Sequence, residues 1–327
     1  MLRLVARRAL SAIPLLAFVL TLTFALLEAA PGDPAATLLG DAPVPPETRA
    51  RILAAYGLDR PPLSRYVSWM TSAARGDLGW SLSRGRPVTK VLAAALPPTI
   101  GLGGAALALQ LLLGLAAGTL HAVRPGGALD RWLSVAGLVL ASVPTFWLGL
   151  MAILLLAVAV PLFPPSSMHS VGAEGWGAPA RAADAAWHAA LPALVLASGS
   201  AAVVARFVRA GLLRSLGEGF ARAARARGAS HGRVLLRHAL PAAAGPVITL
   251  AGLQLPFLVS GAVVVEVVFG WPGMGRVTYD AVLAQDLPVV LASVLLATVL
   301  VIAGNLLADV GLALADPRVR AGAPLVR

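Results

Sequence analysis

Six long stretches of this 327-residue chain contain no aspartate, glutamate, lysine or arginine. They span residues 10–27, 91–120, 132–173, 185–205, 239–265 and 287–308. An α-helix needs about 20 mostly apolar residues to cross the hydrocarbon core of a bilayer, so each stretch suits one crossing. We therefore predict an all-α integral membrane protein with six transmembrane helices.

The composition favours a membrane protein over a soluble enzyme. Hydrophobic residues make up 58% of the chain and charged residues 13%, whereas a soluble domain carries about 25% charged residues. A soluble fold of this length cannot hide so much apolar surface. The chain has no cysteine, which excludes disulfides, thiolate metal sites and a cysteine nucleophile.

The predicted spans cover residues 10–29, 93–120, 132–160, 188–206, 242–266 and 287–309. The third stretch could hold two helices with a break at Pro144. We favour one helix, because no cluster of polar turn residues interrupts it and membrane helices tolerate proline. The first stretch could be a cleaved signal peptide. We favour a retained helix, because its 18 residues exceed the usual apolar length of about 7–15 and Glu28 stands where a small residue is needed.

The basic residues predict the orientation in the membrane. Sixteen of the 26 lie in or beside segments 1–9, 121–131, 207–241 and 310–327. Because cytoplasmic loops carry an excess of arginine and lysine, we predict that these segments and both termini are cytoplasmic. Segments 30–92, 161–187 and 267–286 are predicted to lie outside. The net charge of +11 then reflects topology, and no nucleic-acid partner is expected.

Two polar segments are predicted to fold outside the bilayer core. The outer segment has helical spacing over 47–56 and 64–74, followed by a turn at Gly76-Asp77. In the inner loop, Ser215-Leu-Gly-Glu218 has the form of a capping box, and Gly228 suits the left-handed position after a helix end. This pattern predicts a helix over 216–227, about 18 Å long.

Small side chains on this inner helix would allow another backbone to come close, and they are Ala221, Ala223, Ala224 and Ala226. The helix is therefore predicted to dock on a partner. Ser230 is predicted to cap a second helix that runs to Leu240-Pro241. An ordinary basic cytoplasmic loop fits the same residues.

The familiar catalytic motifs are absent from the sequence. There is no G-x-x-x-x-G-K-[ST] phosphate loop, and the one lysine, Lys90, lies outside any glycine-rich loop. The five histidines form no H-E-x-x-H motif, and we expect His121 and His188 to be solvated or interfacial. No enzyme activity, cofactor or metal site is therefore predicted in this chain. Ionisable residues are scarce inside the spans, which argues against a proton-coupled carrier.

The inner loop resembles the E-A-A-x3-G-x9-I-x-L-P loop of the membrane subunits of ATP-binding-cassette (ABC) importers. Arg222, Ala223 and Ala224 take the first three positions, Gly228 the glycine, and Leu240-Pro241 the closing pair. Arg222 replaces the glutamate and His238 the isoleucine. These departures look like the peptide branch of the family.

Further motifs of the dipeptide and oligopeptide permeases follow in order along the chain. They are Pro31-Gly-Asp-Pro-Ala35, Gly76-Asp-Leu-Gly79 with Ser81-Leu82, Trp271-Pro-Gly-Met-Gly275 and Asp316-Pro-Arg318. The resemblance therefore covers essentially the whole chain.

The resemblance implies a type I ABC importer permease in a bacterial or archaeal cytoplasmic membrane. It implies a second permease subunit, expected to be a different chain, two ABC ATPase subunits that bind ATP and Mg²⁺, and an extracytoplasmic substrate-binding protein. The inner helix would be the coupling helix held by one ATPase. The expected coupling residues are Glu218, Phe220, Arg222, Ala223, Ala224, Arg225, Gly228, Leu240 and Pro241.

The expected cargo is a dipeptide or oligopeptide. The same architecture also carries nickel chelates, glutathione or sugars, and the sequence does not choose among them. A stand-alone channel or secondary carrier and a membrane scaffold remain as other classes. Glu266 and Trp271 are candidates for contact with the delivering protein. Their alternative interpretation is a helix-end carboxylate and an interfacial aromatic.

Overall fold

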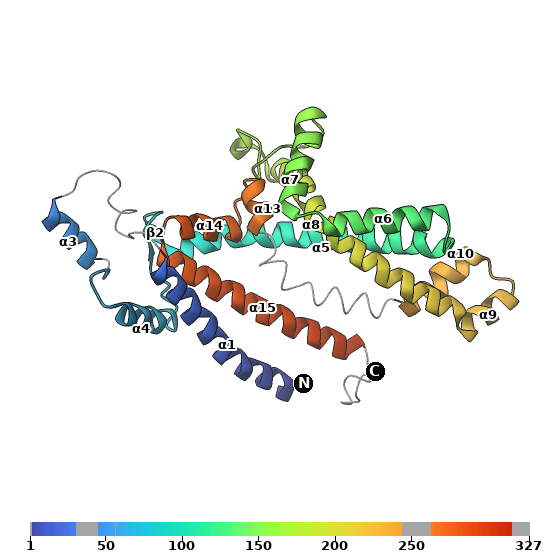
Figure 1. Ribbon diagram of the computed structural model, residues 1–327, viewed down its shortest axis with the longest axis horizontal. Coiled ribbons are helices and arrows are strands. Elements are labelled where there is room, and N and C mark those ends of the chain that lie inside the picture. The colour runs from blue at the N-terminus through green and yellow to red at the C-terminus, as the bar shows by residue number, and fades with distance from the viewer. Residues whose placement is uncertain (1, 31–44, 56, 244–262, 316–327) are drawn as a thin grey trace. The chain divides into compact units, whose positions relative to one another are not determined.

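The computed structural model describes residues 2–30, 45–55, 57–243 and 263–315, and these residues are mainly helical (Figure 1). The predicted all-α membrane class is confirmed. Within the described residues, four helices are long and apolar enough to cross a membrane, and a bent helix pair allows a fifth crossing. This result is compatible with six spans. The predicted span 242–266 lies mostly outside the described residues, as do the motifs at 31–35 and 316–318.

The chain divides into two compact units, which are described separately. The first unit comprises residues 1–99 and 272–302, and the second comprises residues 100–271 and 303–327. Helix α5 (Val88–Val123) begins in the first unit and continues into the second, and α15 (Leu287–Ala315) does the same near the end of the chain.

The first unit is built around the outer segment and the start of the last span. Its elements besides α5 and α15 are α1 (Leu2–Ala29), α3 (Pro46–Ala55), α4 (Pro62–Ala73), β1 (Trp80–Ser81), β2 (Arg86–Pro87) and α14 (Met274–Leu283). The strands pair antiparallel, with Trp80 opposite Pro87. Helices α3 and α4 closely match the two predicted outer helices, and Gly76 has the positive φ of a turn. The buried core joins α5, α14 and α15, with Val88, Met274 and Val289 at its centre.

The second unit contains the remaining helices and the whole inner loop. Its elements are α6 (Ala128–Ser142), α7 (Thr145–Ile153), the π-helical turn η1 (Leu154–Ala159), the short 3-10 turn η2 (Ala173–Gly175), α8 (Ala178–Gly217), α9 (Gly219–Ala226), α10 (His231–Val234), the π-helical turn η3 (Leu235–Ala239) and α13 (Val263–Val268). Helix α8 is longer than the predicted span 188–206, because it continues at both ends.

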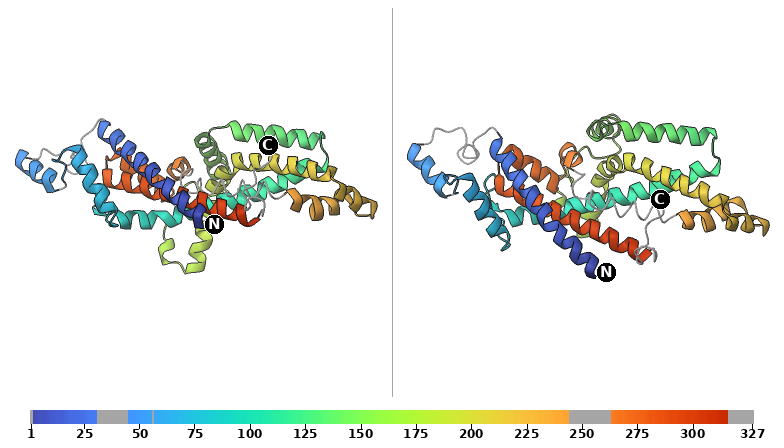
Figure 2. Two further views of the ribbon diagram at one scale, coloured as in Figure 1. Left: turned by 90° about the horizontal axis from the view of Figure 1, so that it is seen from below. Right: turned by 60° about the horizontal axis from the view of Figure 1, so that its bottom comes forward.

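Helix α5 approaches α8 very closely through two glycines. A Cβ atom on Gly114 would lie 2.5 Å from Val204 Cβ, and one on Gly118 would lie 2.6 Å from the Ala205 carbonyl oxygen. Glycines four residues apart are a common means of bringing membrane helices together. Helix α6 runs beside α8 on another side, as both views of Figure 2 show. The C-terminal half of α8 is thus packed against two neighbours.

The single helix favoured for residues 132–160 is wrong. Helix α6 ends at Ser142, α7 begins at Thr145, and the two are bent by 104°. Val143 has φ −75° and ψ 131°, the extended conformation that a residue before proline prefers because the proline ring crowds the helical one. Pro144 then sits at the N-cap of α7, where its missing N–H costs no helical hydrogen bond.

Candidate functional site

The inner loop begins with an abrupt change of direction after α8. Glu218 is the one residue between α8 and α9, and it is extended, with φ −70° and ψ 159°. The predicted capping box is therefore wrong, because Ser215 lies buried inside α8 and Glu218 occupies the N-cap of α9 without a side-chain capping bond. Arg225 ties the junction, since its Nη2 donates a hydrogen bond of 2.6 Å to the Leu216 carbonyl.

One face of α9 packs inside the loop. Ala221 and Ala224 are 0% and 4% exposed, and both pack against Val234 of α10. Leu216 and Ala229 close this small core. Both alanines were predicted to lie against a partner, so that expectation is corrected for Ala221 and Ala224. The spacing of three residues between the two alanines places them on one helix face, and this face is used to fold the loop.

The rest of the α9 surface is exposed and includes an aromatic and a basic side chain. Phe220 is 42% exposed, and Arg222, Ala223 and Ala226 are also exposed. Glu218 is the single acidic residue in segment 207–241, against seven arginines. An aromatic side chain amid small and basic residues is a typical protein-binding surface. We call Phe220, Arg222, Ala223 and Ala226 the α9 face.

The end of α9 has the predicted glycine geometry. Gly228 has φ +84°, and its N–H donates to the Arg225 carbonyl at 2.9 Å. The next N–H, from Ala229, donates to the Ala224 carbonyl at 3.2 Å. This pair of bonds is the Schellman motif, in which a left-handed residue closes a helix. Ser230 occupies the N-cap position of α10, as predicted, but its side chain makes no capping hydrogen bond.

Leu240 and Pro241 follow the π-helical turn η3. The Leu240 N–H donates to the Leu235 carbonyl, five residues back. Leu240 is half-buried and packs on a cluster formed by α5, α8 and η3, whereas Pro241 is exposed. Leu212 and Val208 of α8 form the centre of this cluster. Leu240 thus fixes the loop on α8 and contributes little to the α9 face.

The two candidate outer contacts are buried. Glu266 is 0% exposed, and Trp271 is 2% exposed within a cluster that includes Leu102, Ala106 and Ala193. The backbone N–H of Trp271 also donates to the backbone carbonyl of Glu266 at 2.8 Å. Their expected contact with a binding protein is therefore not available in this conformation. The alternative interpretation, a helix-end carboxylate and an interfacial aromatic, stays a prediction.

Sequence reasoning missed a cluster formed by the C-terminal end of α5, the start of α6 and the C-terminal half of α8. Asp130 in the first turn of α6 is 4% exposed. Its carboxylate accepts hydrogen bonds from Arg209 Nε at 3.0 Å and Arg209 Nη2 at 2.9 Å. His121 Nδ1 lies 2.6 Å from Asp130 Oδ1, and the Gly126 N–H donates to Oδ2 at 2.8 Å. The expectation of a solvated His121 is therefore wrong.

A second carboxylate lies buried near the start of α8. Asp184 accepts hydrogen bonds from the Ser170 hydroxyl at 2.7 Å and the Ser170 N–H at 3.0 Å. His169 Nδ1 lies 3.0 Å from the same carboxylate, and His188, also buried, lies 3.4 Å away. These contacts hold the loop after η1 on α8. His188 is thus a buried structural residue and not the solvated one that we expected.

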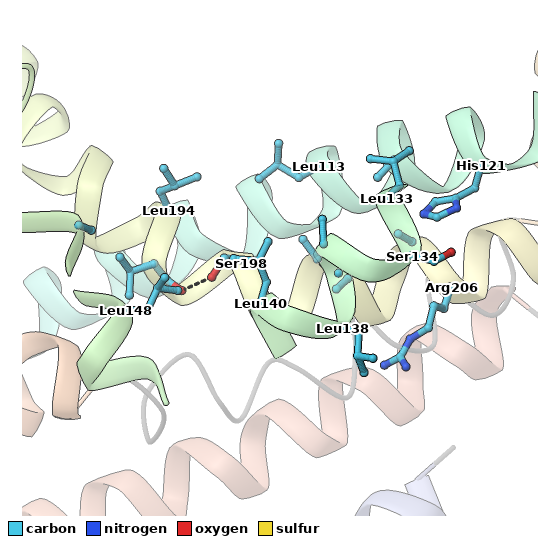
Figure 3. Close-up of a pocket in the computed structure, with 18 of the residues that line it drawn as sticks. Leu113, His121, Leu133, Ser134, Leu138, Leu140, Leu148, Leu194, Ser198 and Arg206 are labelled. Carbon is cyan, nitrogen blue, oxygen red and sulfur yellow. Dashed lines mark hydrogen bonds between the residues drawn. The ribbon is translucent and has the colours of Figure 1, made fainter. Parts of the chain in front are cut away.

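Next to the Asp130 cluster, α5, α6, α7, η1 and α8 line a partly open cavity of about 910 Å³ (Figure 3). Most of its lining is leucine and alanine. His121, Ser134 and Arg206 lie toward one end, and Leu148 and Leu194 toward the other. The cavity therefore has a basic end beside the inner loop and an apolar end away from it.

Two family models together match nearly the whole chain. The model "Binding-protein-dependent transport system inner membrane component" matches residues 110–321. A model for the N-terminal part of such membrane components matches residues 1–103. The first match includes α9, the loop around it and the cavity-lining helices.

Similar proteins span the same length as this chain. The oligopeptide transport system permease protein AppB of Bacillus subtilis (strain 168) is 36% identical, over 96% of this chain and 98% of the relative. The dipeptide transport system permease protein DppB of Escherichia coli (strain K12) is 36% identical, over 98% and 99%. The glutathione transport system permease protein GsiC of the same strain is also 36% identical, over 98% and 99%.

Proposed function

The chain belongs to the family of inner membrane components of binding-protein-dependent transport systems, and from this premise we propose that it is a peptide permease subunit of an ATP-driven importer. It forms half of a translocation pathway. A second permease subunit, a different chain, supplies the other half. Two ABC ATPases bind and hydrolyse ATP with Mg²⁺, and an extracytoplasmic protein delivers the cargo.

The α9 face is the observation that carries this proposal. It is an exposed aromatic and basic surface on a short helix whose other side is locked into the loop by Ala221 and Ala224. A helix held this way moves with α8, because only Glu218 separates the two. The sequence also has no phosphate loop of its own, so we assign ATP hydrolysis to a partner. The α9 face is the surface on which one ATPase docks.

The proposed role of the chain is to convert ATPase movement into a change of access. Closure of the ATPases around ATP displaces α9, and α8 carries that displacement toward the outer side. Packed helices switch between discrete arrangements and do not deform continuously. Such a switch opens the pathway alternately to each side of the membrane. The loop bearing α9 and both termini lie in the cytoplasm of a bacterial or archaeal cell.

Peptides are the proposed cargo, because relatives of equal identity and nearly full coverage are named for oligopeptide and dipeptide transport. A third relative is named for glutathione, which is itself a tripeptide. Selection among peptides is assigned to the delivering protein. Nickel chelates and sugars are the competing cargoes, and competition for uptake separates them from peptides.

The first experiment is a mild detergent extraction of the tagged chain, followed by mass spectrometry of the proteins that accompany it. We expect two phosphate-loop ATPases and a second multi-span permease. The purified assembly in proteoliposomes should then accumulate a labelled dipeptide or tripeptide only with ATP and the binding protein present. Excess unlabelled peptide should suppress uptake, whereas a nickel chelate or a sugar should not.

The α9 face provides the specific control. Phe220→Ala should reduce ATPase retention at least tenfold, because buried aromatic anchors dominate most protein interfaces. Val171→Ala removes an exposed apolar side chain from the outer loop and should leave retention unchanged. A chain that purifies alone in several mild detergents, and that transports cargo without ATPases, would instead be a channel or secondary carrier.

A further inference from the structure

Arg209 and Asp130 join α8 to α6 through two parallel hydrogen bonds near the inner end of both helices. A guanidinium fork that meets a carboxylate in this way fixes orientation as well as distance. The remaining acceptor positions of Asp130 are filled by His121 and the Gly126 N–H. The carboxylate is thus held by α5, by the α5–α6 turn and by α8 together.

The location of this pair links it to α9. Arg209 lies eight residues before Gly217, the last residue of α8, which corresponds to about 12 Å along the helix axis. Directly before Arg209, α5 touches α8 without a gap, since a Cβ on Gly118 would lie 2.5 Å from Val208 Cβ. A displacement that enters α8 from α9 therefore meets the Asp130–Arg209 pair within about two turns.

Beyond the pair, α6 and α8 each supply a wall of the cavity. Ser134 and Gly137 of α6 line one wall, and Ala201 and Ala205 of α8 line another. His121, from the pair's own cluster, lies at the basic end of this cavity (Figure 3). The two cavity walls are thus bound to each other at the end nearest the α9 face. If α9 moved α8 alone, the cavity would change shape in one way. If α9 moved α6 and α8 together, it would change shape in another.

We propose that Asp130 and Arg209 form a transmission clamp, through which the movement of α9 drives α6 and α8 as one body and so reshapes the cavity between them. The two are positioning residues, because they act through the helices that they join. This inference rests on the proposed docking of an ATPase on the α9 face. It adds that coupling fails when α8 moves without α6.

The test compares ATP hydrolysis with peptide uptake in proteoliposomes of the complete assembly. Arg209→Gln should keep the subunits together and keep ATP hydrolysis, yet raise the number of ATP molecules consumed per peptide at least tenfold. Arg209→Lys keeps the charge but loses the two parallel hydrogen bonds. The number of ATP molecules that it consumes per peptide should therefore lie between those of the wild type and of Arg209→Gln. Arg131→Gln removes an exposed arginine next to Asp130 and should keep the wild-type ratio.

The cysteine-free sequence offers a second variant that replaces the ion pair by a covalent link. Asp130→Cys/Arg209→Cys should be uncoupled when reduced and regain the wild-type ratio after treatment with a short bifunctional thiol reagent. Each single cysteine variant treated the same way should stay uncoupled. If Arg209→Gln fails to assemble, the crosslinked double variant tests the clamp by itself. It supports the clamp only if crosslinking restores both assembly and peptide transport.

Three results would overturn the clamp. In the first, Arg209→Gln consumes as many ATP molecules per peptide as the wild type. In the second, the reduced double variant does so. In the third, the crosslinked assembly hydrolyses ATP but does not transport peptide. In each of them the wild-type assembly still transports peptide with ATP, so the proposed function survives. A wild-type assembly that never couples transport to ATP would overturn both.

Discussion

The carboxylate of Asp286 accepts a 2.6 Å hydrogen bond from the hydroxyl of Ser81, which lies 205 positions earlier in the chain. Both side chains are fully buried. The same carboxylate oxygen accepts bonds from the Ser83 N–H at 2.9 Å and the Ser83 hydroxyl at 2.7 Å. These bonds fix the β1–β2 hairpin of the outer segment onto the start of α15. The Gly76-Asp-Leu-Gly79 motif therefore leads into a structural latch.

Asp286→Ala should destabilise the first unit, because it leaves the two serine hydroxyls and a backbone N–H without their buried acceptor. The expected loss is about 2–3 kcal/mol, since bonds to a charged acceptor are stronger than neutral ones and stranded donors add a penalty. Thermal unfolding of the purified assembly in detergent measures it. Arg84→Ala breaks the partly exposed pair with Asp280 and should cost about 1 kcal/mol or less. Equal melting temperatures for the two variants would contradict the latch.

Gly118→Ala should force α5 away from α8. The new methyl group would lie 2.5 Å from Val208 Cβ and 2.6 Å from a backbone carbonyl oxygen of α8, and the backbone cannot rotate aside as a side chain can. Overpacking of this kind costs about 1–3 kcal/mol. Gly104→Ala, in the same helix, meets no atom within 4 Å and should be neutral or gain up to about 1 kcal/mol from helix propensity. A melting temperature that falls only for Gly118→Ala is the expected result.

The sequence predicted the elements that depend on local patterns. Charge-free runs identified the described spans, and Gly228 marked a helix end because a left-handed residue is nearly always glycine. The orientation of α9 was also within reach, since Ala221 and Ala224 share one face three residues apart. The prediction failed there because small residues were assigned to a partner. A helix this short first needs contacts within its own loop.

Two other features depend on contacts that periodicity does not reveal. Asp130 and Arg209 are separated by 79 positions, and each alone looks like an ordinary charge at a membrane boundary. The break at Pro144 depends on the conformation of Val143, whereas α1, α5 and α8 continue through their own prolines. Proline therefore allows a break without requiring one. The neighbouring helices decide the outcome.

Trp271→Ala should lower stability sharply if this residue belongs to the core and not to an outer docking surface. A large aromatic removed from the cluster with Leu102 and Ala193 leaves a cavity, and such changes cost about 3–5 kcal/mol. Trp271→Phe keeps most of the apolar volume. It should retain the stimulation of ATP hydrolysis by the binding protein. If Trp271→Phe has normal stability but loses this stimulation, Trp271 contacts the binding protein.

Two adjacent alanines of α9, one exposed and one buried, separate docking from folding. Ala224→Glu places a carboxylate among Ala221, Val234 and Ala229, where a charge has no partner, so it should cost at least about 3 kcal/mol and unfold the loop. Ala223→Glu places the same carboxylate on the exposed α9 face, so the loop should stay folded, as judged by limited proteolysis. ATPase retention should nevertheless fall tenfold or more, which corresponds to about 1.4 kcal/mol of binding free energy. Ala182→Glu, an exposed position near the other end of α8, should change neither quantity. Normal retention and uptake in Ala223→Glu would show that the α9 face is not where the ATPase binds.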